Sequence, residues 1–291
     1  MAKLDTRAIG LDGGLKFIRW LTGGEHLHYG YWPGLEVNAG NFGAAQEAYS
    51  LKLFEQIPKA PRRILDIGGG AGETAKKLLA LGHHVEIVVP SPLLADRCRV
   101  NAPGARVHEM TFEEFDAAQA SFDLCLFSES YQYVALEVGL SKALGLLAEG
   151  GEIVIADCFR REGFRFEGVA QRVGGGHPME RFRETLDDLP LTLAHEEDIT
   201  EAVAPSVDIE QELFNVIGYT LTRIDTELES KKPFQRSMLN RLWRLLTSER
   251  TRARLDQRLN QKTRNAQAFA EYNRYLILRF EQSGAVPDGA E

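Results

Sequence analysis

The sequence contains few cysteines and no long apolar run, and each absence excludes a class of protein. Its three cysteines, Cys98, Cys125 and Cys158, are odd in number and lack the spacing of metal ligands, so a disulfide framework and a metal site are not expected. No stretch reaches the roughly 20 apolar residues that cross a bilayer. Residues 1–14 lack the basic and then apolar pattern of a secretion signal. We therefore expect a cytoplasmic protein with reduced thiols and no transmembrane segment.

The charge is unevenly distributed along the chain. The net charge of -8 over 291 residues argues against a nucleic-acid-binding protein, and no RNA- or DNA-binding motif is present. Residues 231–280, however, hold thirteen Lys and Arg against three acidic residues. A helix expected over about 236–259 carries an apolar stripe that includes Leu239, Leu242 and Trp243. This basic segment is either a solvated helix face or a surface that recognises an acidic substrate, a carrier protein or a lipid surface.

Strand-like and helix-like segments alternate from residue 62 onward. Short β-branched runs end in glycine, proline or acid and are separated by segments with helical spacing. The expected strands are 62–69, 83–90, 105–110, 122–129, 152–159, 189–200 and 273–281, and the expected helices are 72–82, 92–102, 138–151 and much of 207–270. Near-continuous apolar strands alternating with helices predict a parallel sheet that is covered on both faces.

A glycine-rich turn follows the first expected strand. Asp66 is followed by Gly68, Gly70 and Gly72, which open directly into a helix. Positions without side chains let the backbone turn sharply and let a ligand lie against it. Residues 70–75, GAGETA, also fit the pattern of a nicotinamide or flavin site, which needs an acid at the end of the second strand. That strand ends at 88–91 without an acid, so a nicotinamide-dependent oxidoreductase remains an alternative only.

The D-x-G-x-G-x-G arrangement at 66–72 resembles the first motif of class I S-adenosylmethionine (SAM)-dependent methyltransferases. The segments SFDLCLFSESYQYV (121–134) and ALGLLAEGGEIVIADCF (143–159) resemble later motifs of that family in the right order, and the resemblance covers about residues 26–280. It implies a doubly wound, mostly parallel seven-stranded α/β sheet with a helical cap and lid. It also implies SAM as cofactor, no metal, and methyl transfer to a small molecule.

Three further matches resemble the tocopherol, sterol and cyclopropane-type C-methyltransferases. VVPSPLLADRC (88–98) resembles the variant strand end of that subgroup, residues 28–32 (HYGYW) its cofactor-covering loop, and residues 128–130 its fourth-strand signature. In this resemblance Asp66 and the glycines shape the methionine end of the site. The cofactor contacts that it implies are Tyr29, Tyr31, Trp32, Asp66, Gly68, Gly70, Gly72, Ser91, Pro92, Thr111, Phe112 and Ser128. Ser91 would meet the ribose, and Thr111 and Phe112 would approach the adenine.

Methyl transfer needs little beyond alignment, and a base is required only where the accepting atom carries a proton. The first candidates for that base are Glu129 and His28, and the second choices are Tyr131, Tyr133 and His177. No Ser-His-Asp arrangement is visible in the sequence.

The expected organisation is an N-terminal helical cap at 1–59 with the cofactor-covering loop, and a SAM-binding α/β domain at 60–291 with a helical lid at about 201–270. The expected function is methylation of a natural product or lipid-like acceptor, on carbon in preference to nitrogen or oxygen. Because residues 231–280 are basic, the acceptor could also be anionic or bound to a carrier protein. The alternative function is that of a SAM-binding homologue that does not methylate or that serves as a partner subunit. The sequence does not decide whether the protein forms a homodimer.

Overall fold

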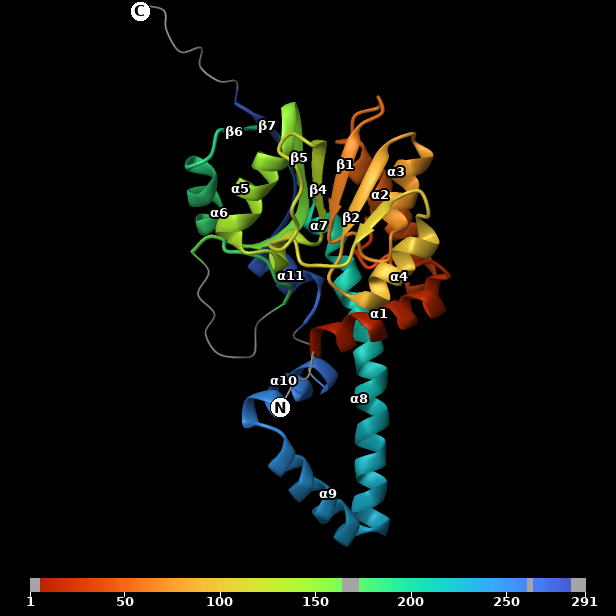
Figure 1. Ribbon diagram of the computed structural model, residues 1–291. Helices are drawn as coiled ribbons and strands as arrows, with labels where there is room; N and C mark the ends of the chain where they lie inside the picture. Colours follow the sequence, from red (N-terminus) through yellow and green to blue (C-terminus); the bar gives the residue numbers. More distant parts are fainter. Residues whose placement is uncertain (1–5, 164–172, 261–263, 284–291) are drawn as a thin grey trace, which may run out of the picture.

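The computed structural model describes residues 6–163, 173–260 and 264–283. Its centre is a seven-stranded sheet in the order β3-β2-β1-β4-β5-β7-β6 (Figure 1). The strands are β1 (Arg63–Ile67), β2 (His84–Val88), β3 (Arg106–His108), β4 (Phe122–Ser128), β5 (Leu147–Arg160), β6 (Leu191–Asp198) and β7 (Asn273–Gln282). The first five are mutually parallel, while β7 lies antiparallel between β5 and β6. The predicted doubly wound, mostly parallel α/β fold is confirmed.

Alternate residues of the central strands supply two cores, because successive side chains of a strand point to opposite faces. Ile64 and Leu124 belong to the core on one face, and Leu65 and Cys125 to the core on the other. The first core is covered by α2 (Phe42–Phe54), α3 (Glu73–Ala80) and α4 (Pro92–Asn101), and the second by α5 (Leu136–Leu146) and α6 (Met179–Asp187). Short 3-10 helices occupy η1 (Ala39–Asn41) and η2 (Tyr131–Tyr133).

Helices follow one another between β6 and β7, where the sequence predicts a lid. They are α7 (Thr200–Val203), α8 (Pro205–Lys231), α9 (Pro233–Leu246), α10 (Glu249–Asn260) and α11 (Ala266–Tyr272). Figure 1 shows α8 leaving the sheet and projecting away from it, with α9 returning at an angle and α10 lying nearer the core. The N-terminal helix α1 (Thr6–Thr22) crosses below the sheet beside the upper part of α8.

Two predicted elements differ from the structure. The single helix expected at 236–259 is two helices in the structure. Helix α9 ends at Leu246 because the backbone at Thr247 is extended, and α10 begins at Glu249. The expected helix at 138–151 ends at Leu146, and the pairing of β5 with β4 shifts register after Leu147, where Gly150 adopts a positive φ of 70°. The division into 1–59 and 60–291 stays a prediction, and residues 1–5, 164–172, 261–263 and 284–291 lie outside the described part of the chain.

Candidate active site

The glycine turn after β1 brings the backbone against neighbouring elements. Gly68 has a φ of 76°, and a Cβ there would lie 2.4 Å from the Cβ of Ser130. Gly72 has a φ of 88° and precedes α3, where a Cβ would lie 2.9 Å from the Cα of Cys98. Both positions therefore need glycine for conformation and for space. Gly72 lines neither of the two cavities described below, and its place in the motif is explained by the packing of α3 on α4.

A cavity of about 470 Å³ opens beside this turn, at the carboxyl ends of β1, β2 and β4. We call it the glycine-loop cavity. Many of the residues expected from the resemblance line it, namely His28, Asp66, Gly68, Gly70, Ser91, Thr111, Phe112, Ser128 and Glu129. The end of parallel strands is the usual ligand position in such sheets.

Asp66 gives this cavity an unsatisfied acceptor. Its side chain is buried, and the Oδ2 atom has no hydrogen-bond partner among the described residues. Burial raises the pKa of this carboxyl to about 7, because an ion is costly to hold away from water. A buried carboxylate oxygen that lines a cavity and lacks a partner suits a cationic hydrogen-bond donor.

The end of β2 supplies no acid, as the sequence indicates. Ser91 instead caps α4, and its Oγ accepts a hydrogen bond from the Leu94 amide at 3.3 Å. Pro92 begins that helix and does not line the cavity, because its exposed ring fills the first helical position. The expected cofactor contact of Pro92 is therefore not supported.

Glu25 also lines the glycine-loop cavity, although sequence reasoning did not select it. Arg97 of α4 donates to both of its oxygens at 2.8 Å, and Asn101 donates to Oε2 at 2.7 Å. These charge-assisted bonds fix the segment that precedes residues 28–32 to the helix after β2. Both carboxylate oxygens of Glu25 are therefore used to bind α4. No sequence motif indicates this role.

Residues 28–32 are held between α2 and α8. The Tyr31 amide donates to the Ala45 carbonyl at 2.8 Å. The Ser206 hydroxyl accepts from the Gly30 amide and from Trp32 Nε1, both at 2.9 Å. Trp32 is only 3% exposed, inside a small apolar cluster with Phe42 and Ile209.

The expected cofactor contacts of these aromatic residues are corrected in part. Tyr31 and Trp32 line neither cavity described here, because their side chains pack against the surrounding helices. Tyr29 lines a second and larger cavity instead of the glycine-loop cavity. The loop thus contributes His28 to the glycine-loop cavity and Tyr29 to its neighbour.

This larger cavity, which we call the chamber, has a volume of about 1360 Å³. Its walls come from α1, the 28–32 loop, α8, α10 and the ends of β4, β5 and β7. It shares lining residues with the glycine-loop cavity, namely Gly10, Leu11, Leu27, His28, Glu129, Tyr133 and Arg258. The two cavities therefore adjoin, and Glu129 lies at their junction.

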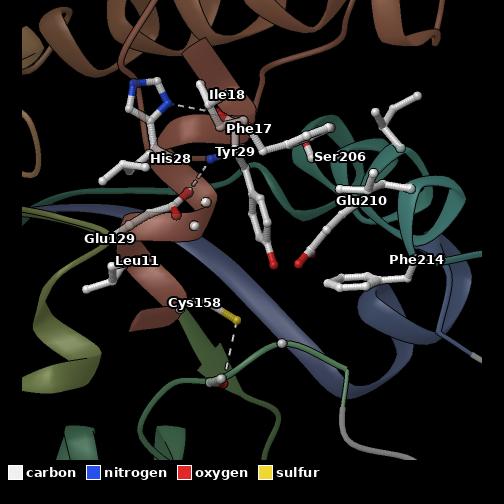
Figure 2. Close-up of a pocket in the computed structure, with 18 of the residues that line it drawn as sticks. Leu11, Phe17, Ile18, His28, Tyr29, Glu129, Cys158, Ser206, Glu210 and Phe214 are labelled. Carbon is white, nitrogen blue, oxygen red and sulfur yellow. Dashed lines mark hydrogen bonds between the residues drawn. The ribbon is translucent and has the colours of Figure 1, made fainter. Parts of the chain in front are cut away.

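Glu129 is held in an unusual backbone conformation directly after β4, with a φ of 52°. Its Oε1 accepts a hydrogen bond from the Tyr29 amide at 2.7 Å (Figure 2) and another from the Tyr275 hydroxyl at 2.9 Å. Burial, and less strongly the charge of Asp157, raise the pKa of Glu129 to about 8. Oε2 has no hydrogen-bond partner within the described ranges. Such a carboxyl can accept or donate a proton near neutral pH.

His28 lies nearby but both of its ring nitrogens are engaged. Nδ1 donates to the Tyr29 carbonyl at 2.8 Å, and Nε2 lies 3.1 Å from Nδ1 of His26. The ring stacks on Tyr49 with centroids 4.3 Å apart. Burial lowers the pKa of His28 to about 3, which keeps it neutral. The geometry favours a positioning role over the predicted role as base.

Tyr131 and His177 line neither the glycine-loop cavity nor the chamber. Tyr131 is fully buried, and its hydroxyl donates to the Leu136 carbonyl at 3.4 Å. Nε2 of His177 faces the carbonyls of Tyr131 at 3.1 Å and Val134 at 3.0 Å. Both side chains hold the segment after β4, and this geometry does not support the catalytic roles predicted for them.

Charged side chains from the part of the chain between β6 and β7 also line the chamber. Glu210 of α8 faces Arg264 at 2.5 Å and Arg258 at 3.2 Å. Figure 2 shows the Tyr29 hydroxyl and the Glu210 carboxylate pointing toward one another beside Phe214. Nη1 of Arg264 is buried without a partner among the described residues. Sequence reasoning placed a basic segment here but did not identify these individual residues.

The described residues contain no group of three or more His, Cys, Asp or Glu side chains that could hold a metal ion. Over the same residues, no helix has the length and hydropathy needed to cross a membrane.

Residues 64–151 match the family model of a methyltransferase domain. An uncharacterized methyltransferase from Mycobacterium tuberculosis is 29% identical over 97 residues, which cover 33% of this chain and 40% of that relative. The chain thus spans less than half the length of this curated relative.

Two solved structures share the fold over nearly their whole length. Geranyl diphosphate C-methyltransferase from Streptomyces coelicolor A3(2), in complex with S-adenosyl-L-homocysteine, superposes with a TM-score of 0.62 at 15% identity, covering 97% of this chain and 100% of that one. The cyclopropane synthase MmaA2 from Mycobacterium tuberculosis superposes with a TM-score of 0.65 at 15% identity, covering 93% and 95%. Residues 64–151 are therefore similar to a methyltransferase domain, and the chain as a whole shares its fold with these two structures.

Proposed function

We propose that this protein is a SAM-dependent methyltransferase that acts on a small organic acceptor in the cytoplasm, with carbon as the favoured methylated atom. The observation that carries the proposal is the pair of adjoining cavities with Glu129 at their junction. One cavity lies on the glycine motif, and the other is large and mostly separate from it. A reaction between a cofactor and a second molecule needs this arrangement.

The residues of the glycine-loop cavity fit SAM. The turn at Gly68 and Gly70 leaves the backbone open for close approach, and Asp66 offers a buried oxygen without a partner to an ammonium group. Thr111 and Phe112 lie at the adenine end in the family arrangement, and both line the cavity. When bound, the cofactor supplies a methyl group activated by a positively charged sulfur.

The chain's own groups orient the acceptor and handle its proton. The carboxylate of Glu129 carries a free oxygen at the junction, while Tyr275 and the Tyr29 amide fix its other oxygen. The Tyr275 hydroxyl lies 2.7 Å from that of Tyr49, which extends the network away from the cavity. An acceptor carbon that loses a proton after methylation would transfer it to Glu129, because a pKa near neutrality suits a general base.

The chamber walls favour an amphiphilic acceptor with a negative group. Apolar side chains cover much of the wall, including Leu11, Phe17, Ile18, Leu213, Phe214 and Ile217. Three arginines, Arg250, Arg258 and Arg264, line the chamber, and Arg258 and Arg264 pair with one carboxylate, Glu210. An anion placed there would neutralise the remaining positive charge.

Calorimetric titration with SAM, followed by mass spectrometry with methyl-deuterated SAM and a panel of apolar carboxylates and phosphate esters, tests the proposal. We expect SAM binding and a labelled product from one acceptor class. Absence of SAM binding refutes the proposal, and stabilisation by NAD alone would favour an oxidoreductase. Binding without transfer across the panel, together with a co-purifying protein, would favour a partner subunit. Light scattering on the same preparation decides between a monomer and a homodimer.

A further inference from the structure

The part of α8 and α9 that projects from the molecule exposes an unusual number of apolar side chains. We call residues 216–246 the arm (Figure 1). Phe234 is 82% exposed, Leu245 83% and Leu246 74%. The other large apolar side chains exposed on the arm are Val216, Ile217, Tyr219, Leu221, Ile224, Met238, Leu239, Leu242 and Trp243. A concentration of this kind on a soluble domain marks an interaction surface.

Helix α9 has the pattern of a helix that lies in a membrane interface. Phe234, Met238, Leu242 and Leu245 recur at helical spacing and share one side of the helix. The basic side chains Arg241 and Arg244 fall at the margin of this side and on the polar face. An apolar face with Trp, Phe and Leu, bordered by arginines, is the arrangement that lies among lipid headgroups.

The charge of the arm complements an anionic surface. The arm holds six basic and three acidic residues within a chain whose net charge is -8. Each of its three acids is already paired, with Arg223, Lys231 or Arg236. Lys232, Arg241 and Arg244 have no acidic partner in the described part of the chain. Positive charge that is not neutralised locally is therefore available to lipid phosphates.

The arm is continuous with the chamber. Phe214 and Ile217 of α8 line the chamber, and Leu221 and Ile224 continue the same helix side outward along the arm. Arg250, the second residue of α10, lines the chamber and lies four residues beyond the end of the arm. An apolar route thus runs along α8 between the exposed helices and the candidate acceptor site.

We propose that the arm docks on an anionic lipid surface, with the apolar face of α9 inserted among the headgroups and the route along α8 leading to the chamber. The docking stands on the exposed arm and its charge and does not depend on methyl transfer. Its link to the chamber rests on the proposed function and identifies the acceptor class as membrane-borne amphiphiles.

Vesicle flotation tests the docking with the full-length protein and no SAM. We expect binding to vesicles of phosphatidylcholine with 30% phosphatidylglycerol, and much weaker binding to phosphatidylcholine alone. Arg241→Glu combined with Arg244→Glu should weaken binding by about 30-fold or more, since each basic residue near the surface contributes about 1 kcal/mol. Leu245→Glu should weaken it comparably, and its high exposure leaves the fold undisturbed.

Matched variants outside the arm are the controls. Leu51→Glu replaces an exposed leucine of α2, and Arg62→Glu with Arg106→Glu reverses two exposed charges near the sheet. Both controls should bind vesicles like the native protein. Equal binding to neutral vesicles, or binding that the arm variants leave intact, overturns the proposal. A dimer that binds no vesicles and that Leu245→Glu converts to a monomer would overturn it as well, because a second copy would then cover the arm.

Methylation assays keep the docking separate from the proposed function. With a water-soluble acceptor, the arm variants should retain kcat, whereas with the acceptor embedded in anionic vesicles their rate should fall in step with binding. Vesicle binding without SAM binding would leave the docking intact and refute the proposed function. SAM binding without vesicle binding would do the reverse.

Discussion

Asp66→Asn should remove most of the pH dependence of cofactor binding. In the native protein the Asp66 carboxyl has a pKa of about 7, because it is buried with one oxygen lacking a partner. An ammonium group bound to that oxygen would return the pKa toward the ordinary value of 3.8. The difference corresponds to about 4 kcal/mol of coupling, at 1.36 kcal/mol for each pKa unit.

The sign and size of the effect follow from this coupling. Since binding favours the ionised carboxylate, affinity rises with pH until Asp66 is ionised in the free protein. With a free pKa of about 7, binding at pH 8 should be about tenfold tighter than at pH 6. Asp66→Asn should bind about 10- to 100-fold more weakly at pH 8, because a charge-assisted hydrogen bond is lost.

Isothermal titration with S-adenosylhomocysteine at pH 6, 7 and 8 is the appropriate assay, because this ligand lacks the charged sulfur that would also act on Glu129. Asp157→Asn is the matched control. Its carboxyl is equally buried, with a pKa raised to about 7, but it binds Gln132 and Cys158 and lines neither cavity. The reasoning is refuted if Asp66→Asn keeps the native affinity and pH slope, or if Asp157→Asn loses them.

Three further predictions concern neighbouring residues. On an acceptor that loses a proton, we expect the rate of the native protein to rise as pH increases toward 8, because Glu129 then becomes ionised. Glu129→Gln should abolish this rise and lower kcat about 100-fold or more; an unchanged pH–rate profile would argue against the base. Gly68→Ala should abolish SAM binding and lower the melting temperature, because its φ is 76° and its Cβ would overlap Ser130; native-like calorimetry would contradict this. Ser206→Ala should cost about 1–3 kcal/mol in urea unfolding, since two buried donors lose their acceptor, whereas Ser141→Ala, at an exposed position of α5, should cost far less.

The sheet and the glycine-loop cavity could be predicted because their signals are local. The apolar runs between 62 and 159 each give one strand, and Asp66 with its glycines follows the first of them directly. Ser91 was placed at the end of β2 by the same local pattern. The strand order at the edge of the sheet could be predicted only from the resemblance to class I methyltransferases. No local signal shows it, since the pairing of β5 with β7 joins segments more than a hundred residues apart.

The remaining site residues lacked any local signal. Tyr275 reaches Glu129 from a strand 146 residues later, and Ser206 reaches Trp32 across 174 residues. The aromatic run at 28–32 gave no indication of which rings face a cavity, because each orientation depends on α2 and α8. The sequence likewise shows Arg258 and Arg264 only as members of a basic segment. Their position in the chamber depends on their ion pairs with Glu210 of α8.

Helix α8 also has a mechanical consequence. Its first turn holds the 28–32 loop through Ser206, its first four turns contribute side chains to the chamber, and its remaining turns form part of the arm. Twenty-seven residues of continuous helix span about 40 Å. One uninterrupted helix therefore carries the support of the loop, a wall of the chamber and the base of the arm, so the direction in which the arm projects is fixed by the same contacts that hold the loop.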